Sequence, residues 1–278
     1  MNRQWKKRNG AKIRLAARRA KLIRDAIKQS INVESVIEQW NAQNFQTMTP
    51  EQARDWARTN IRPDSEALMR AFRTLYAESY VLGEDIGMSA IMRAKINKAP
   101  TLQQMRNASG INWDKWKPGN RAAAQLVKPP RGLSNLLDRR GITIQGLNQT
   151  SIDRIGTALA RILERGDTPR DADISDIIDD PIRALTITQT EMSRAVTTAS
   201  RELYEDSGVE LVEWLVADPC DLCQENADVS PIRIDDTFPS GDTEPPAHPN
   251  CVCDIAPYVV DTQNIGEDAL SIILGDEE

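Results

Sequence analysis

The chain has 278 residues, of which 40% are hydrophobic and 27% are charged, with a net charge of −6. This balance excludes a membrane protein and a wholly disordered one. No apolar run reaches the roughly 18–20 residues that span a bilayer, and no signal-peptide block is present, so we expect no membrane association and residence in the cytoplasm. Aromatic residues make up only 5%, and a core of Leu, Ile, Ala and Met favours helices over a β-sandwich.

The N-terminal segment is strongly basic. Residues 3–28 contain eleven Lys or Arg residues and a single acid, Asp25. Apolar residues recur there at helical spacing, but the stripe is narrow, so a free helix would be marginal. We therefore expect this arm to order when it docks on an acidic partner surface or on DNA, with a solvated surface helix as the alternative. The predicted docking residues are Arg3, Lys6, Lys7, Arg8, Lys12, Arg14, Arg18 and Arg19.

Two further helices are predicted in the N-terminal half. Residues 49–52, Thr-Pro-Glu-Gln, have the pattern of a capping box with proline at the first helical position. A long helical pattern then runs from Asp64 towards Pro100. Gly83 and Gly87 lie one turn apart inside it, which predicts close approach of another helix.

Residues 111–146 interrupt the helical periodicity with Trp, Pro and Gly, and we interpret them as a linker around one short helix at 120–126. A helix that begins at Thr150 or Ser151 and ends at Gly166 is predicted next. The elements predicted after it are a helix from Pro181 to Gly208 and two strands, 209–217 and 252–260, that could pair.

The predicted fold is mainly α, with a helical N-terminal half that contains a long helix. A small α+β lobe follows, with a two-stranded sheet and a Cys/His loop of the metal-binding type. The expected divisions are a helical region with the basic arm at 1–110, the linker at 111–146, a Cys/His domain at 147–260 and an acidic tail at 261–278.

All four cysteines and the only histidine fall within a window of 34 residues, 220–253. Cys220-x-x-Cys223 and His248-x-x-Cys251-x-Cys253 are separated by a proline-rich loop. Two chelating pairs joined by a stiff loop are what a structural Zn²⁺ site needs, and cysteines in a chain without a secretory signal favour metal over disulfides. Five candidates compete for four positions. If residues 251–253 are extended, Cys251 and Cys253 point to opposite faces, which would leave one outside the ligand shell.

Two alternatives to a structural zinc site stay open from the sequence. One is a disulfide between the two cysteine pairs, and the other is a set of reduced, buried cysteines. A catalytic zinc fits least, because it needs an open coordination position and a nearby general base, and no His-x-Glu or His-Glu-x-x-His pattern is present.

The sequence does not favour an enzyme. It contains no phosphate-binding Gly-x-x-x-x-Gly-Lys, no dinucleotide-binding Gly-x-Gly-x-x-Gly after a strand and no Gly-x-Ser-x-Gly. Its single histidine belongs to the metal pattern, which leaves no candidate for acid–base chemistry at neutral pH. The carboxylates Asp176, Asp179 and Asp180 are interpreted as a solvated loop and helix start rather than a metal site.

Several runs in the second half of the chain match a known pattern. They are Arg183-Ala184, Thr190-Glu191-Met192-Ser193-Arg194-Ala195, Tyr204, Ser207-Gly208-Val209, Trp214, the Cys-x-x-Cys pair and Pro245-Pro246-Ala247-His248-Pro249-Asn250-Cys251-Val252-Cys253. Together they resemble the phage Mu F-like minor head (head morphogenesis) protein family, over roughly residues 130–258. The most specific part is His-Pro-Asn-Cys-x-Cys after Cys-x-x-Cys.

The resemblance implies a minor component of a tailed-phage procapsid that associates with the portal vertex. The implied partners are the portal protein and the major capsid or scaffold protein, with DNA as a further partner of the basic arm. The implied location is the host cytoplasm during assembly and then the virion, in the capsid interior or at the portal vertex. A rival interpretation is a nucleic-acid-binding zinc module that acts on packaged or injected DNA, although the Cys/His window is acidic.

Four residues of the matching helix stand out for their charge and spacing. Glu191 and Arg194 are an i,i+3 pair that can form a salt bridge, and Arg183 recurs on the same face three turns earlier. One hypothesis is that these side chains, with Thr190, hold the helix against the metal-bearing lobe. The alternative is a surface ion pair worth a few tenths of a kcal/mol.

Overall fold

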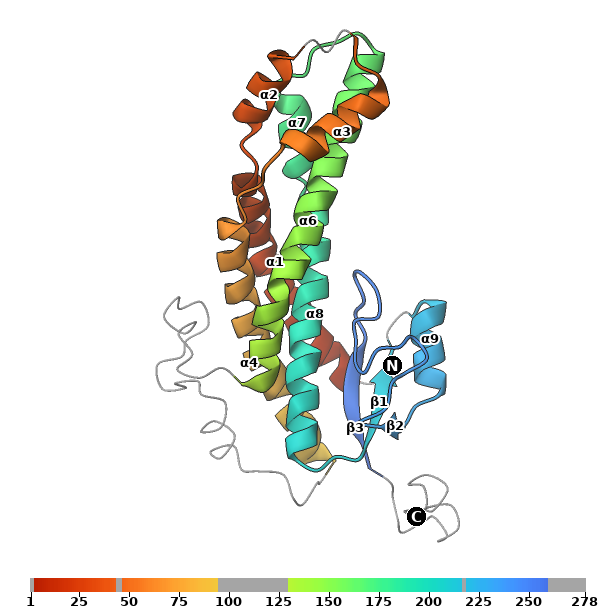
Figure 1. Ribbon diagram of the computed structural model, residues 1–278. Helices are drawn as coiled ribbons and strands as arrows, with labels where there is room; N and C mark the ends of the chain where they lie inside the picture. The colour runs from red at the N-terminus through yellow and green to blue at the C-terminus, as the bar shows by residue number, and fades with distance from the viewer. Residues whose placement is uncertain (1–2, 44–46, 95–129, 217–218, 260–278) are drawn as a thin grey trace.

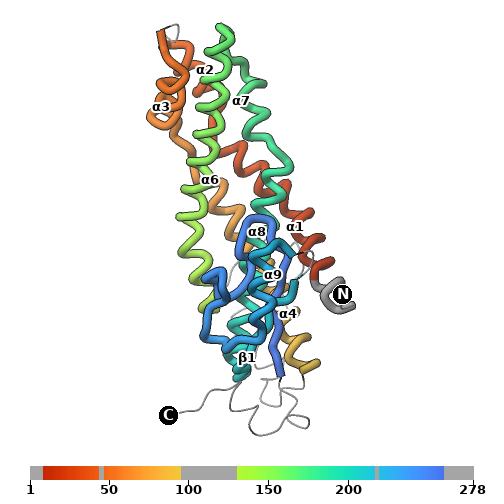
Figure 2. The backbone as a smooth tube through the Cα atoms, turned by 90° about the vertical axis from the view of Figure 1, so that its right-hand side faces the viewer, coloured from red at the N-terminus to blue at the C-terminus, as the bar shows by residue number. Residues whose placement is uncertain are grey.

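The computed structural model describes residues 3–43, 47–94, 130–216 and 219–259. Figure 1 shows a long helical bundle with a small lobe packed against the lower part of one side, and this lobe faces the viewer in Figure 2. The helices are α1 (Arg3–Ser30), α2 (Val33–Asn41), α3 (Pro50–Asn60), α4 (Glu66–Arg93), α6 (Arg131–Glu164), α7 (Asp171–Ile178), α8 (Pro181–Asp206) and α9 (Asp221–Asp228). The strands are β1 (Leu211–Leu215), β2 (Ile232–Arg233) and β3 (Asp254–Tyr258).

The bundle consists of the four long helices α1, α4, α6 and α8, whose apolar faces share one core. Leu75 and Tyr76 of α4 lie in this core with Val196 and Ala199 of α8. The short helices α2, α3 and α7 cover the upper end of the bundle (Figure 1). The mainly α fold predicted from the sequence is thus confirmed.

The local signals at several helix ends act as predicted. The Thr49 hydroxyl accepts a hydrogen bond from the Gln52 N–H, and the Gln52 side chain accepts one from the Thr49 N–H, so the capping box of α3 is complete. The long helix α4 begins at Glu66. Helix α8 ends two residues before Gly208, whose φ of 69° is in the left-handed region that favours glycine.

The close helix approach predicted at Gly83 and Gly87 is confirmed at the contact between α4 and α8. A Cβ atom at Gly83 would lie 2.3 Å from the carbonyl oxygen of Val196. A Cβ atom at Gly87 would lie 3.2 Å from the Cα of Ser200, whose hydroxyl donates a hydrogen bond to the Gly83 carbonyl over 2.9 Å. The two backbones therefore approach more closely than any side chain at Gly83 would allow.

Helix α6 differs from the prediction, because it begins at Arg131 and not at Thr150. The interpretation of residues 131–146 as linker is therefore wrong, whereas the short helix predicted at 120–126 lies outside the described residues. Gly132, one of the residues that suggested a break, lies in the first turn of α6. Its N–H donates to the Glu202 carboxylate over 2.8 Å, and a Cβ there would lie 2.6 Å from the same carboxylate. This glycine allows a close contact between α6 and α8.

Helix α1 is part of the bundle, so the expectation that the basic arm orders only on binding is wrong. Leu15, Ala16, Ile23 and Ile27 are buried against the other helices. Although the apolar stripe is narrow, α4 and α8 together cover it. Tertiary packing of this kind supplies the stability that an isolated helix of such composition lacks.

The lobe contains a three-stranded antiparallel sheet in the order β2-β1-β3, rather than the predicted two strands. The predicted pairing of the two longer strands is confirmed, with Trp214 opposite Ile255. Both strands are shorter than the sequence suggested. The additional strand β2 has only two residues, too few to produce an alternating pattern in the sequence.

The expected domain boundaries near residues 110 and 146 stay predictions. Side chains from both sides of them lie in the same core, and the lobe packs against the lower ends of α4 and α8. The predicted acidic tail at 261–278 lies entirely outside the described residues. Among the helices described, none combines the length and apolarity needed to cross a membrane.

Candidate metal centre

The five candidate ligands come from two stretches of the lobe. Cys220 immediately precedes helix α9, and Cys223 lies in its first turn. His248, Cys251 and Cys253 lie in the loop that leads into β3. The fold brings these stretches together, and the Cys/His groups could hold a metal ion.

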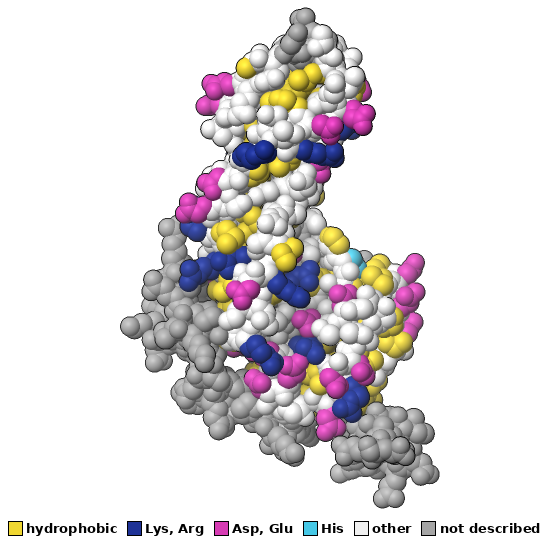
Figure 3. Space-filling view, viewed as in Figure 1, with side chains coloured by type: hydrophobic (Ala, Val, Ile, Leu, Met, Phe, Trp, Pro, Cys, Tyr) yellow, Lys and Arg dark blue, Asp and Glu magenta, His cyan; other side chains and the backbone are white. Residues whose placement is uncertain are grey.

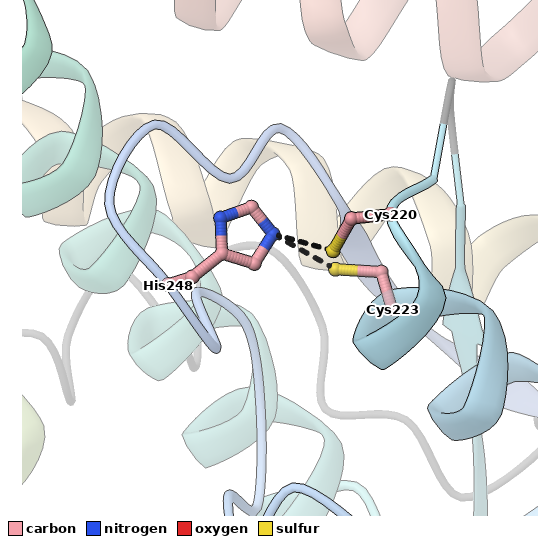
Figure 4. Close-up of side chains that lie close together, drawn as sticks. All are labelled: Cys220, Cys223 and His248. Atoms are coloured by element: carbon pink, nitrogen blue, oxygen red, sulfur yellow. Dashed lines mark hydrogen bonds between the residues drawn. The ribbon is translucent and has the colours of Figure 1, made fainter.

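His248 joins the two stretches through its imidazole ring, which points from its loop towards the start of α9 (Figure 4). Its Nε2 atom lies 3.3 Å from Cys220 Sγ and 3.2 Å from Cys223 Sγ. The other ring nitrogen, Nδ1, lies 2.9 Å from the carbonyl oxygen of Pro249. A proton on Nδ1 satisfies that carbonyl and leaves the Nε2 lone pair directed at the two sulfurs, as a metal-bound histidine requires.

The three buried cysteines form a second group around Cys223. The Sγ atoms of Cys223 and Cys251 are 3.7 Å apart. Those of Cys223, Cys251 and Cys253 all lie within 4.8 Å of one another. Cys251 and Cys253 therefore do not point to opposite faces, as they would if residues 251–253 were extended, and these residues are not part of a strand.

The distances in the cluster fit a tetrahedral metal site. Zinc bonds of about 2.3 Å to sulfur and 2.0–2.1 Å to nitrogen give ligand-to-ligand edges of roughly 3.4–3.8 Å. The three contacts of 3.2, 3.3 and 3.7 Å that link Cys220, Cys223, His248 and Cys251 are close to this range. Cys220, Cys223 and His248 form one compact group and Cys223, Cys251 and Cys253 form a second, so Cys223 is the residue that both groups share.

The thiols differ in how readily they ionise. A hydrogen bond from the Cys253 thiol and further ones from the backbone at Cys253 and Ala247 lower the pKa of Cys251 to about 5. Burial, with repulsion from the charge on Cys251, raises the pKa of Cys223 to about 12. The hydrogen bond to Cys251 raises the pKa of Cys253. Of the three buried thiols, Cys251 is thus the one whose surroundings favour the thiolate form, which is the form that binds metals.

Helix α8 supports the loop that carries His248 and Cys251. Its Thr190 hydroxyl accepts a hydrogen bond from the Asn250 N–H over 2.8 Å. About two turns further on, Thr197 donates to the Pro245 carbonyl and Thr198 donates to Glu244. The hypothesis that this face holds the helix against the lobe is thus supported at Thr190.

The charged residues of the same motif contact the bundle instead. Arg183 donates to the Ser151 hydroxyl and to a backbone carbonyl of α6, each over 3.0 Å. Glu191 is buried and accepts a hydrogen bond from the Tyr76 hydroxyl of α4 over 2.6 Å. Arg194 Nε lies 3.7 Å from Glu191, so the predicted i,i+3 pair is present. These contacts tie α8 to α6 and α4, not to the lobe.

The structure separates the predicted docking cations. Arg14 and Arg18 are exposed on α1, whereas Arg19 forms an ion pair with Glu78 of α4. Lys12 is buried at 3% exposure, so its expected role as an exposed docking residue is wrong. The side chains of Arg3, Lys6, Lys7 and Arg8 lie outside the described part of the molecule.

The three carboxylates before α8 have different surroundings. Asp176 is solvated as expected, but it lies within helix α7 and not in a loop. Asp180 accepts hydrogen bonds from the Ile182 and Arg183 N–H groups and caps α8, as predicted for a helix start. Asp179 departs from the solvated interpretation, because Arg24 and Lys28 of α1 both bind it and lower its pKa.

Sequence reasoning missed one contact of the site, between Lys12 of α1 and Asp254, the residue after Cys253. The only signal was an acid at the start of an otherwise apolar strand.

In comparisons with known proteins, the chain matches no family model, no curated protein and no solved structure. The geometry of the Cys/His cluster therefore carries the functional conclusion.

Proposed function

We propose that this protein is a minor head protein of a tailed phage, with a C-terminal lobe closed by a structural zinc ion. One observation carries the proposal: the separate runs that resemble the Mu F-like family come together at one site. Thr190 of α8 binds the His-Pro-Asn-Cys segment at Asn250, and the same segment places His248 on the Cys-x-x-Cys pair. Residues far apart in sequence thus act as one unit that closes the lobe.

In this proposal the ligands of the zinc ion are Cys220, Cys223, His248 and Cys251. Nitrogen and thiolate ligands in tetrahedral arrangement suit zinc, and the ion adds stability that the small lobe lacks. Cys253 lies outside this shell and donates a hydrogen bond to Cys251. Because protein side chains would fill all four positions, the role proposed for this ion is structural and not catalytic.

Metal analysis of protein purified without chelator tests the zinc assignment. We expect about one zinc per chain and four thiols that become reactive only after the metal is removed. Glu225→Gln, an exposed change on the same helix as Cys223, serves as the matched control and should retain the metal. Substoichiometric zinc together with oxidised thiols would replace this assignment with a disulfide.

The proposed partners are the portal protein and the major capsid or scaffold protein. The bundle offers long exposed helical faces for such contacts, and Arg14 and Arg18 present two positive charges on α1. Because exposed charges attract a partner only within about a Debye length, this docking should weaken as salt rises. The proposed location is the procapsid interior or the portal vertex.

Genetics of the phage or prophage that encodes the chain tests the assembly role. We expect neighbouring reading frames for a portal protein upstream and a capsid or scaffold protein downstream. Deleting the gene should leave defective heads, and wild-type protein should restore them whereas Cys223→Ser should not. The Arg14→Gln/Arg18→Gln variant should co-purify less with procapsids than Arg165→Gln, a control at the far end of the bundle. Normal infectious heads without the gene would end the proposal.

The rival function, a nucleic-acid-binding zinc module, would rely on the exposed cations Arg14 and Arg18 of α1. Helix α9 at the metal site exposes Asp221, Glu225 and Asp228, and acidic side chains follow the outer edge of the lobe in Figure 3. Such a surface repels phosphates. DNA binding by the wild-type chain that falls steeply with salt and disappears in Arg14→Gln/Arg18→Gln would favour this rival.

A further inference from the structure

Lys12 extends from helix α1 into the base of the metal loop. Its Nζ atom donates a hydrogen bond to the Cys253 carbonyl oxygen over 3.3 Å and lies 3.3 Å from the Asp254 carboxylate. The side chains of Lys12 and Asp254 are only 3% and 2% exposed. An ion pair so fully withdrawn from water joins the first helix of the chain to the last strand.

Stability alone does not account for such a pair. Burying two charges costs several kcal/mol per ion, and apolar residues of similar size often stabilise a fold equally well. We therefore interpret the buried pair by the backbone positions that it holds in place. Here the fixed geometry is that of Cys253. The ladder between β1 and β3 ends at Asp254, so the sheet offers no partner to the Cys253 carbonyl, and Lys12 provides one.

Helix α1 also forms a wall beside Cys251. Asn9, Lys12 and Ile13 line a small cavity together with Cys251 and Val252. The segment from Cys251 to Cys253 has no regular secondary structure, so contacts with neighbouring elements determine its position. Thr190 holds its start through Asn250, and Lys12 holds its end.

We propose that Lys12 is a positioning residue of the metal centre. By binding the Cys253 carbonyl and Asp254, Lys12 holds the segment in which Cys251 lies close to Cys223. Helix α1 thereby contributes a residue to the metal site. This inference rests on the zinc site proposed above. Groups that orient metal ligands from behind typically change metal affinity about 10–100-fold when removed, and we expect a change of that size for Lys12.

The test compares zinc affinity in full-length variants by competition with a coloured chelator. Lys12→Met removes the ammonium, and Arg18→Met removes an exposed charge from the same helix as the matched control. Because Lys12→Met leaves Asp254 buried without its lysine, Lys12→Met/Asp254→Leu removes both charges and keeps a folded comparison. The absorption spectrum of bound Co²⁺ reports the ligand geometry, which a purely structural role for Lys12 would not alter.

We expect both Lys12 variants to bind zinc about 10–100-fold more weakly than wild type and to shift the Co²⁺ spectrum, with Arg18→Met unchanged. A folded double variant with wild-type zinc affinity and spectrum would overturn the positioning role and leave the zinc site standing. A wild-type protein that binds no zinc would overturn both. The two failures are therefore distinguishable.

Discussion

The bundle and the lobe bury their side chains in different ways. The hydrophobic core of the bundle contains 33 buried side chains, drawn from every helix from α1 to α8 that the structure describes. The lobe core holds 13, of which three are cysteines and five come from the ends of α4 and α8. The bundle can therefore be stable through apolar burial alone, whereas the lobe depends on borrowed helix ends and, in our proposal, on a metal.

The Cys/His cluster thus lies in the region of the molecule that has the smaller apolar core. Trp214 and Phe238 are the large aromatic side chains that residues 209–259 contribute to this core, and their ring centroids lie 4.9 Å apart in an edge-to-face arrangement. Small domains with so few large apolar residues commonly need a metal or disulfides. Substitutions in each region should separate stabilisation by apolar packing from stabilisation by a bound metal.

Cys223→Ser should have the largest effect, because it removes the buried cysteine shared by both groups of candidate ligands. We expect loss of bound zinc, and with it of roughly 10 kcal/mol of metal-binding free energy. Hydrogen exchange should show lost protection over residues 209–258 and near Lys12, with the upper bundle unchanged. An equal loss of hydrogen-exchange protection in α2 and α3 would show that the bundle depends on the metal as much as the lobe does.

Gly83→Ala should destabilise the bundle by about 1–3 kcal/mol, because its Cβ would lie 2.3 Å from a backbone oxygen of α8. Gly141→Ala on the exposed side of α6 is the matched control, since a Cβ there meets no atom within 4 Å. The control should stabilise the protein by about 0.5–1 kcal/mol through helix propensity. Thermal melts measure both changes, and zinc content should be unchanged in both.

Glu84→Gln should remove a pH dependence from the bundle. Burial first, and then the charges of Asp85 and Glu202, raise the pKa of Glu84 from 4.5 to about 8. The folded state therefore keeps a proton that the unfolded chain loses, and stability falls as pH rises from about 4.5 to 8. At pH 8 the variant should be about 1–3 kcal/mol more stable than wild type, with little difference at pH 4.5. Urea unfolding at both pH values decides it.

Thr190→Val should have the smallest effect, about 1 kcal/mol, because it removes one hydrogen bond to the Asn250 N–H. We expect faster hydrogen exchange near Asn250 and His248, with bundle amides unaffected. Thr186→Val, one turn earlier on the same helix, is the control. An identical response from both variants would show that Thr190 does not hold the metal loop.

The sequence predicted those parts of the structure that depend on local signals. Pro50 and Pro181 start helices, Gly208 follows the end of one, and the two cysteine-containing stretches meet as their spacing implied. These features follow from backbone conformations and ligand chemistry that act over a few residues. Their physical causes are visible without tertiary structure.

The remaining features depend on partners far away in sequence. Gly132 has the composition of a break, yet its contact with Glu202 makes it a packing position within a helix. The cations of α1 suggested a free arm, yet Glu78 and Asp254 pair with two of them. The two-residue strand β2 forms only because β1 lies beside it. No pattern within a short window contains this information.

The contact between Lys12 and Asp254 also affects the order in which the chain can be completed. The two residues are 242 positions apart (254 − 12), so at a synthesis rate of about 5–20 residues per second the lysine waits roughly 10–50 s for its partner. Until then its ammonium stays hydrated and the first turns of α1 lack their final contacts. A chain that stops before residue 254 never makes this contact, so the first turns of α1 should exchange their amide hydrogens faster in such a chain than in the complete one.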